Sequence, residues 1–304
     1  TDLSAGAANE INSFGPSENG VRSAYYRSMA TAGLEARWPI LFSTASSTHV
    51  LEPMAQIFAR PNEPYHDRVG IPNEDAQSMV FDATTLFERD KFSGYDRIEG
   101  GTRANIGLRY SGTFAAGWTA HGLFGQSYHL AGANSYAAPD LVHAGAYSGL
   151  ESDVSDYVGQ FGIVTPNGLA FSAAGRFDEE TFELRRAEVK AGGAVGPVTA
   201  NVRYAYIQRQ PFYGFDEDRR EVTAQTSVRF NENWRGFASG TYELESQTLV
   251  KNTIGFAYDD ECFTYLMTFS QERDIDGSDT KQSFGFNSSL RTLGDFGSSS
   301  GALS

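Results

Sequence analysis

The second half of the chain is built from segments in which apolar and polar side chains alternate, with polar turn residues between one segment and the next. In the stretch from Val198 to Tyr206, Val, Ala, Val, Tyr and Tyr fall on one face of an extended chain, and Thr, Asn, Arg and Ala fall on the other. Repeated segments of about ten residues with this period are the sequence signature of a transmembrane β-barrel.

Alternation and turn residues along the whole chain predict thirteen strands. Two of these strands depart from the pattern. In 48–59, Pro53 lacks the N–H that would donate a hydrogen bond to the neighbouring strand, and in 182–191 the alternation is poor. A further strand at 79–87 would make the number even. The expected fold class is all-β, an antiparallel up-and-down transmembrane β-barrel. The thirteen strands are predicted at residues 21–38, 48–59, 101–111, 117–128, 154–164, 168–178, 182–191, 197–208, 218–230, 234–244, 248–258, 262–272 and 282–292.

Short and long connections alternate between the predicted strands. Asn231-Glu232-Asn233 is one of the short ones, whereas residues 60–100 form the longest. Outer-membrane barrels have short turns in the periplasm and long loops outside the cell. Trp38, Trp118 and Trp234 all lie beside short connections, so we expect them to form a girdle at the periplasmic interface.

The direction of the first predicted strand indicates that upstream strands are missing. Residues 21–38 end at Trp38 and therefore run from the outside toward the periplasm, whereas a complete barrel chain enters from the periplasm. The odd strand number also conflicts with the even number of complete single-chain barrels. We therefore expect residues 1–304 to be the C-terminal part of a larger outer-membrane barrel, with a C-terminal tail at 294–304.

Composition excludes two classes of protein. No apolar run reaches the roughly 18 residues of a membrane-spanning helix. The net charge of −14 argues against a nucleic-acid partner, since phosphates would be repelled.

Several motifs carry a family resemblance. The most specific are Ile71-Pro72-Asn73-Glu74-Asp75, Leu86-Phe87, Phe92-Ser93-Gly94-Tyr95-Asp96-Arg97 and Glu99-Gly100-Gly101. Together with Gly125-Gln126-Ser127-Tyr128 and Tyr258-Asp259-Asp260-Glu261-Cys262, they resemble the C-terminal barrel of the LptD family, the lipopolysaccharide-assembly proteins of Gram-negative outer membranes. The resemblance runs from about Arg37 to Gly294.

The resemblance implies a translocon rather than an enzyme. Lipopolysaccharide would arrive along a periplasmic bridge protein, pass a periplasmic jellyroll domain that precedes the barrel, and leave into the outer-membrane lipid through a lateral seam. The plug lipoprotein LptE would sit inside the barrel. Nothing in residues 1–304 looks like the jellyroll, which we expect upstream. No catalytic residue, cofactor or metal site is expected.

The family's late cysteines form disulfides with the amino-terminal domain, which implies an upstream partner for Cys262. The alternative is a lone thiol at the start of a strand. By the strand map, Cys262 lies at a periplasmic turn, in an oxidising compartment.

The long connection 60–100 is the first candidate site, since a loop of this length is usually functional or disordered. The resemblance implies that it folds against the lumen, closes the extracellular mouth and supports the plug. A structural loop with internal salt bridges is the alternative. Its candidate residues are Pro72, Asn73, Glu74, Asp75, Gly94, Tyr95, Asp96, Arg97, Gly100 and Gly101.

Two further sets are candidates. Guanidinium groups bind phosphate oxygens bidentately, so basic residues on the lumenal face could guide a phosphorylated head group, although such charges are ordinary in any water-filled barrel. These basic residues are Arg103, Arg109, Arg176, Arg203, Arg229, Lys251 and Arg291. By resemblance, residues 282–292 form one lip of the lateral gate, with the candidate residues Phe284, Phe286, Asn287, Ser289 and Leu290.

Other functions are weighed against this one. A general porin or substrate-specific channel is the main alternative. A barrel hydrolase ranks third, because no Gly-x-Ser-x-Gly elbow accompanies the five His residues. Asp274, Asp276, Gly277 and Asp279 loosely resemble a calcium loop, but the final acidic residue is absent, which favours an exposed acidic hairpin.

Overall fold

The computed structural model divides the chain into two units. Unit 1 comprises residues 1–115, 119–161 and 174–185, and unit 2 comprises residues 116–118, 162–173 and 186–304. The residues that the structure describes are 2–5, 9–12, 24–27, 29–62, 81–92, 94, 97–137, 145–260, 262–273, 280–290 and 294–298. Among these residues, no helix has the length and apolar character needed to cross a membrane.

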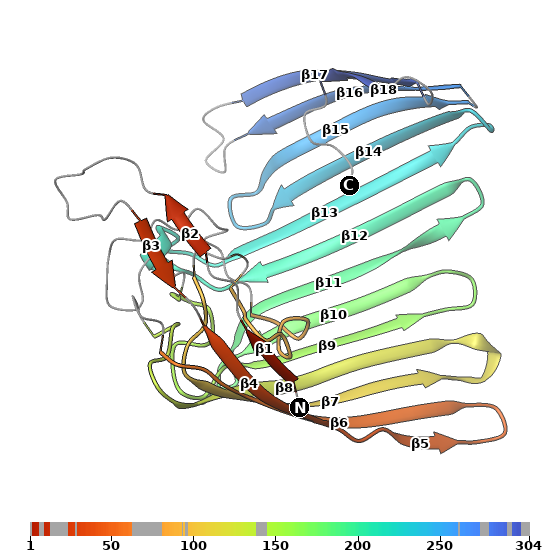
Figure 1. Ribbon diagram of the computed structural model, residues 1–304. Helices are drawn as coiled ribbons and strands as arrows, with labels where there is room; N and C mark the ends of the chain where they lie inside the picture. Colours follow the sequence, from red (N-terminus) through yellow and green to blue (C-terminus); the bar gives the residue numbers. More distant parts are fainter. Residues whose placement is uncertain are drawn as a thin grey trace. The chain divides into compact units, whose positions relative to one another are not determined.

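Unit 1 contains a meander of antiparallel strands (Figure 1). Each strand pairs with the next along the sheet, and β5 extends the line of β4 along the far half of β6. The strands are β4 (Ala30–Arg37), β5 (Ile40–Ser43), β6 (Thr48–Ala59), β7 (Thr102–Thr113) and β8 (Thr119–Ala131).

Pro53 is accommodated inside β6 because the neighbouring strand is interrupted there. β4 ends at Arg37 and β5 begins at Ile40, and the Trp38 N–H donates to the Pro53 carbonyl over 3.1 Å. In a strand, the N and the carbonyl of one residue point to the same neighbour. The donor that proline lacks therefore points into the break and costs no ladder bond.

The predicted strand 21–38 is wrong in its extent. Residues 30–37 form β4, but β3 (Ala24–Arg27) pairs instead with β2 (Asn9–Asn12) in a separate two-stranded sheet. β4 leaves β6 at the Ala32–Ala59 pair, because β6 ends at Ala59. On its other edge, β4 pairs with β1 (Asp2–Ala5) from Ala30 to Gly33.

Unit 2 contains a second antiparallel meander, in which consecutive strands again pair (Figure 1). Its strands are β12 (Val198–Ile207), β13 (Arg219–Arg229), β14 (Trp234–Glu243), β15 (Thr248–Asp259), β16 (Phe263–Arg273), β17 (Thr280–Leu290) and β18 (Gly294–Ser298). β9 (Tyr157–Val164), β10 (Ala170–Phe177) and β11 (Leu184–Val195) each have residues in both units. Two short 3-10 turns are η1 (Ala115–Gly117) and η2 (Pro211–Tyr213).

The predicted strands from 48–59 onward are confirmed, with ends shifted by at most four residues. The antiparallel up-and-down meander is that of the transmembrane β-barrel class, as predicted. The possible strand at 79–87 is not formed, because residues 82–87 make turns. The expected tail contributes β18, which pairs with β17 and was not predicted because its sequence lacks alternation.

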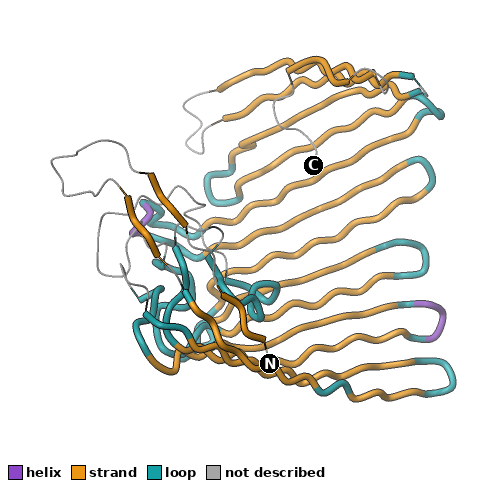
Figure 2. Tube along the Cα trace, viewed as in Figure 1, coloured by secondary structure: helices purple, strands orange, loops and turns teal. Residues whose placement is uncertain are grey.

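Short turns and longer connections alternate along most of the sheet, as predicted, but the β14–β15 connection, residues 244–247, is as short as the β13–β14 turn (Figure 2). The β13–β14 turn is residues 230–233, whereas 132–156 separate β8 from β9. Trp118 and Trp234 lie beside short turns, as predicted, and their exposures of 45% and 47% suit side chains at a membrane interface. The prediction is wrong for Trp38, which is 73% exposed, because it lies in the break between β4 and β5, opposite Pro53, and the turn follows only at 44–47.

Candidate functional site: a buried loop network and a lipid-facing aromatic groove

The strands of unit 1 have one polar and one apolar face. On β7, the side chains of Arg103 and Asn105 are buried, whereas Ile106 and Leu108 on the opposite face are 54% and 42% exposed. Large apolar residues exposed on one face of a sheet are what a lipid-facing surface requires. We therefore treat the face of Arg103 as the lumenal one.

The described residues of 81–101, which leave out 93, 95 and 96 and are called the 81–101 loop below, contact this polar face, and Glu99 is at the centre of their contacts. Its carboxylate pairs with Arg103 and lies 3.5 Å from an Arg60 guanidinium nitrogen. All three side chains are at most 5% exposed. Lys91, which is also buried, adds a third positive charge around Glu99.

A chain of hydrogen bonds joins the loop to three strands. The Lys91 ammonium lies 3.5 Å from the Asn105 side-chain oxygen, and the Asn105 amide donates to Gln56 on β6 over 2.8 Å. Gln56 in turn donates to the Phe87 carbonyl of the loop, and the Ser127 hydroxyl of β8 donates to Asn105. Because these groups are buried and bonded to one another, the loop has one favoured position.

Burial and charge shift the pKa values in this network in opposite directions. Burial raises the pKa of Asp90 to about 6, and the nearby Glu99 charge adds to the shift. Burial lowers the pKa of Lys91 to about 8, although Glu99 opposes it. Burial alone would raise the pKa of Glu99, but Lys91, Arg103 and Arg60 together outweigh it and hold that pKa below its ordinary value.

An apolar cluster packs beneath the polar network. Two connections contribute to it, the first through residues between 81 and 92 and the second through Tyr136 and Leu150, and Arg103 lies 5.3 Å from the centre of the Tyr136 ring. Phe87 and Phe92 pack against the cluster from the loop side. Its fully buried members are Phe81, Leu86, Tyr136, Leu150 and Val158.

Two glycines on facing strands allow the loop to lie this close. Gly107 and Gly125 are direct partners in the β7–β8 register. A Cβ atom on Gly125 would lie 2.6 Å from a Leu86 methyl carbon and 2.3 Å from the Ile106 carbonyl oxygen, and one on Gly107 would lie 3.0 Å from the Phe87 ring. The missing side chains therefore leave the space that Leu86 and Phe87 fill.

A second polar cluster holds the end of the 132–156 loop. The Arg176 guanidinium of β10 lies 3.1 Å from the Asp156 carboxylate and donates to the Tyr147 carbonyl over 2.8 Å. Burial nevertheless raises the pKa of Asp156 to about 7, outweighing Arg176. Asp156, Asp178 and Glu179 are close enough to share a cation, but Asp178 is already bound by Arg185 and by the backbone of its own turn.

The predicted loop residues are only partly described. Arg97 is buried, with 5% of its surface exposed, and Gly100 and Gly101 are buried beside the Glu99 network; Gly94 is half-buried. Gly101 has a φ of +78°, which favours glycine. Pro72, Asn73, Glu74, Asp75, Tyr95 and Asp96 lie outside the described residues.

The predicted lumenal cations have different surroundings. Arg103 and Arg176 are buried in ion pairs, whereas Arg109 is 3.9 Å from Glu52 and Arg203 is 3.5 Å from Glu188, both with largely exposed side chains. By alternation, Arg229 and Lys251 share the polar face of their strands, opposite Val228 and Ile254. Arg291 lies outside the described residues.

The predicted gate strand and Cys262 lie at the end of unit 2. Phe284 and Phe286 on β17 are 71% and 41% exposed, and Asn287 and Ser289 point to the opposite face. Leu290 is the last residue of β17. Cys262 is an exposed free thiol in the β15–β16 turn, where its N–H donates to the Asp260 carboxylate over 2.7 Å.

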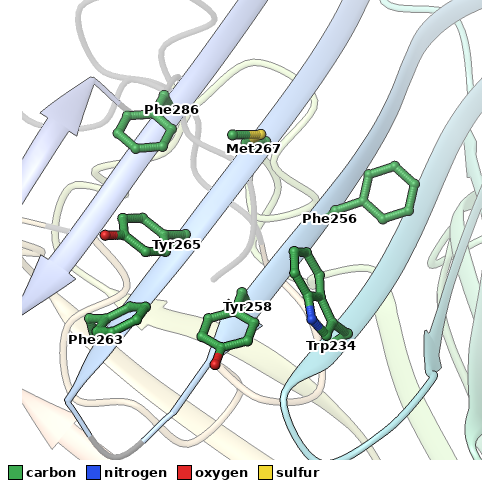
Figure 3. A pocket seen from close by; sticks show the side chains of 7 residues that line it. All are labelled: Trp234, Phe256, Tyr258, Phe263, Tyr265, Met267 and Phe286. Carbon is green, nitrogen blue, oxygen red and sulfur yellow. The ribbon is translucent and has the colours of Figure 1, made fainter.

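An aromatic groove lies on the apolar face of β14–β17 (Figure 3). Its volume is about 390 Å³. Gly236 and Ser288 are the register partners of Phe256 and Tyr265, and because their side chains are absent or small, the surface is recessed at these two positions. Its lining residues are Trp234, Phe256, Tyr258, Phe263, Tyr265, Met267 and Phe286. Because Trp234 and Phe263 follow short turns, the groove lies at the membrane-interface end of these strands.

Glu99, Arg60, Lys91 and Asp90 are the site residues that the sequence alone did not identify. A signal was present, since Glu99 directly precedes two glycines in a motif that carries the family resemblance. Its partners are 4 to 39 residues away and come together only through the strand register.

Comparison with known proteins gives a family. A model of LptD, described as LPS transport system D, matches residues 3–234. The LPS-assembly protein LptD of Psychrobacter cryohalolentis is 25% identical over 217 residues, which are 67% of this chain and 20% of that protein. The one from Nitrosomonas europaea is 23% identical, over 66% of this chain and 26% of that protein. The chain thus spans about a quarter of the length of the curated relatives it matches.

Solved structures that resemble the chain are outer-membrane proteins of low similarity. A mutant of the Rh. blastica porin has a TM-score of 0.39 and 10% identity, covering 95% of this chain and 90% of the porin. The copper transporter OprC has a TM-score of 0.40 and 10% identity, covering 88% of this chain and 50% of the transporter. The family assignment rests on the sequence match instead: because the family model covers well over half of the residues, the chain belongs to the LptD family of bacterial outer-membrane proteins.

Proposed function

We propose that this chain is part of an outer-membrane translocon that receives lipopolysaccharide from the periplasm and inserts it into the outer leaflet through a lateral gate. The family match over residues 3–234 carries the proposal. Relatives in the family are named for LPS assembly. The strands' separate polar and apolar faces support it, because such a translocon needs a hydrated interior within a lipid-facing wall. The chain has no covalent step to perform in this scheme.

The buried loop has a supporting role in the proposal. Residues 81–101 are fixed to the polar face of β6–β8 by Glu99 and its cations. A rigid segment in this place would narrow the extracellular mouth and give the plug lipoprotein LptE a fixed surface to rest on. Ion pairs and hydrogen bonds that are fully buried suit this task, since they favour one arrangement of the loop over others.

The gate is assigned to β17, whose outer edge is paired with β18 from Phe286 to Leu290 and has no partner strand from Thr280 to Gly285 among the described residues. Its outward residues Phe284 and Phe286 face lipid, whereas Asn287 and Ser289 are small or polar on the other face. Small side chains provide little cross-strand contact, so pairing along this part of the sheet is weak enough to open. The amino-terminal domain would contact the periplasmic bridge protein and would supply the upstream cysteine that pairs with Cys262.

Complementation tests the proposal. Cells depleted of the full-length protein should regain surface lipopolysaccharide, measured by antibody labelling of intact cells, when wild-type protein is supplied. Glu99→Gln should reduce this recovery, and the exposed turn variant Glu180→Gln should not. Normal surface lipopolysaccharide in depleted cells would contradict the proposal. Porin-like conductance of the purified protein in planar bilayers, together with that result, would favour the channel alternative.

A further inference from the structure

Two arginines that the basic lining did not include lie on either side of Ile207 on the polar face of unit 2. Arg186 on β11 and Arg219 on β13 are both register partners of Ile207 on β12. Register partners point to the same face of a sheet, and neighbouring strands are about 4.8 Å apart. The two side chains therefore start about 10 Å apart and flank Ile207, with like charges that repel each other.

The carboxylates on this face are bound elsewhere. Glu188 and Glu221 lie 3.5 and 3.7 Å from the Arg203 guanidinium, one row further along the strands. The Glu243 carboxylate accepts the backbone N–H groups of Arg220 and Ser246 over 3.1 and 2.7 Å. Over the described part of the chain, no carboxylate lies within ion-pair distance of Arg186 or Arg219.

Arg219 is held in place without being neutralised. Its guanidinium lies 3.9 Å from the centre of the Phe215 ring and donates to the Gln210 side-chain oxygen over 3.2 Å. Both contacts come from the connection 208–218, which turns at Gly214 with a φ of +82°. Asp218 from the same connection is directed away, because it accepts the Tyr206 hydroxyl on the opposite face. Most of the five donors of Arg219 therefore stay available to a ligand.

We propose that Arg186 and Arg219 bind a phosphoryl group at the loop end of this lumenal face. Among the described residues neither guanidinium has an ion-pair partner, although Glu221 and Glu243 attract Arg219 from a greater distance. Two such groups on one face, one of them fixed by an aromatic ring, suit an oxyanion with several oxygens, which each guanidinium can bind bidentately. The inference rests on the proposed function in taking the phosphorylated head group of a glycolipid as the source. Free inorganic phosphate has the same chemistry and is the second source to be tested.

Calorimetric titration of the full-length protein in detergent micelles tests the site. The probes are phosphorylated lipid A, the same lipid after phosphatase treatment, and inorganic phosphate. The test variant carries Arg186→Gln and Arg219→Gln. The matched control carries Arg220→Gln and Arg235→Gln, which removes one positive charge from the opposite face of β13 and one from the other end of the sheet, at the start of β14.

The test variant should bind phosphorylated lipid A about a hundredfold more weakly, since each lost charged contact costs about tenfold. Phosphatase treatment should weaken wild-type binding by a similar factor, and the control variant should bind as the wild type does. Inorganic phosphate that binds as tightly as the lipid, and depends on the same arginines, would support the site and identify free phosphate as its ligand.

Two results would overturn the site: equal affinity of the test and control variants, or equal wild-type affinity for phosphorylated and phosphatase-treated lipid A. Neither result would affect the proposed function if wild-type protein still restores surface lipopolysaccharide in depleted cells. If it does not restore it, the proposed function fails whatever the binding data show.

Discussion

Replacing Glu99 with Gln should release the 81–101 loop from the strands. The substitution keeps the side chain's size and removes the negative charge that Arg60, Lys91 and Arg103 surround. These three cations are each at most 5% exposed, so water cannot take the place of the carboxylate. Breaking a buried ion pair by removing one partner costs about 3–5 kcal/mol.

The expected size of the effect follows from that cost. Every 1.4 kcal/mol changes an equilibrium about tenfold, so the fraction of molecules with an open loop should rise by about two to three and a half orders of magnitude. Trypsin reports the opening, because Arg89 and Lys91 lie within the loop. When opening is fast relative to cleavage, the cleavage rate follows the population of the open form.

Glu52→Gln is the control, since it breaks a pair on the same two strands, β6 and β7, at 3.9 Å from a largely exposed Arg109. An exposed pair contributes about 0–1 kcal/mol, so cleavage should change less than about tenfold. Adding Arg103→Gln to Glu99→Gln should slow cleavage again, because one unpaired buried cation is removed. Equal cleavage of Glu99→Gln and Glu52→Gln would refute the ion network as the cause of loop packing.

Three further predictions concern other parts of the structure. Gly125→Ala should destabilise the protein by about 1–3 kcal/mol in urea unfolding, because its Cβ would lie 2.3 Å from the Ile106 carbonyl oxygen and 2.6 Å from Leu86. Gly240→Ala, with no atom nearer than 3.8 Å, should not, and equal midpoints would contradict this. Burial raises the pKa of Asp156 from 3.8 to about 7, so between these values the folded protein holds a proton that the unfolded protein releases. The free energy of unfolding should therefore fall as the pH rises from about 4 to 7. Asp156→Asn should flatten that slope, and an unchanged slope would exclude Asp156 as its source. In a variant that keeps Trp234 as its single tryptophan, phospholipids brominated near the head group should quench the Trp234 fluorescence more than phospholipids brominated at the chain end. The opposite order would mean that the groove lies deep in the bilayer.

The strands were predictable because a two-residue period is a local property. From β6 to β17, alternation located each strand to within a few residues, even at 182–191, where the pattern is poor. The N-terminal part was not predictable in the same way. β4 begins two residues before Ala32, which pairs with the last residue of β6, and β3 pairs with β2, so the partner rather than the local sequence sets these boundaries.

The candidate sites depend on register, which the sequence pattern does not specify. Arg186 and Arg219 are 33 residues apart in the sequence and share one row of the sheet only because Ile207, which lies between them, pairs with both. Arg60, Lys91 and Glu99 likewise come together through the way β6 and β7 position the two ends of one connection. The charged residues of each strand can therefore be named as candidates from the sequence, but the sequence pattern does not show which of them lie close together in the fold.

The glycine pair of β7 and β8 shows where a sequence signal for the loop does exist. A glycine in a strand interior weakens pairing and usually indicates a bulge or a close approach of other atoms. Gly107 and Gly125 are register partners, and a side chain at either position would lie on the polar face of the sheet. If that face met only water, any small or polar residue would fit there. Leu86 and Phe87 of the loop fill the space that the missing side chains leave. Both residues are apolar, and without this contact their exposure to a hydrated lumen would be unfavourable. The loop's position is therefore encoded jointly, by two apolar residues in the loop and by two missing side chains on the strands, and a change on either side should open the same contact.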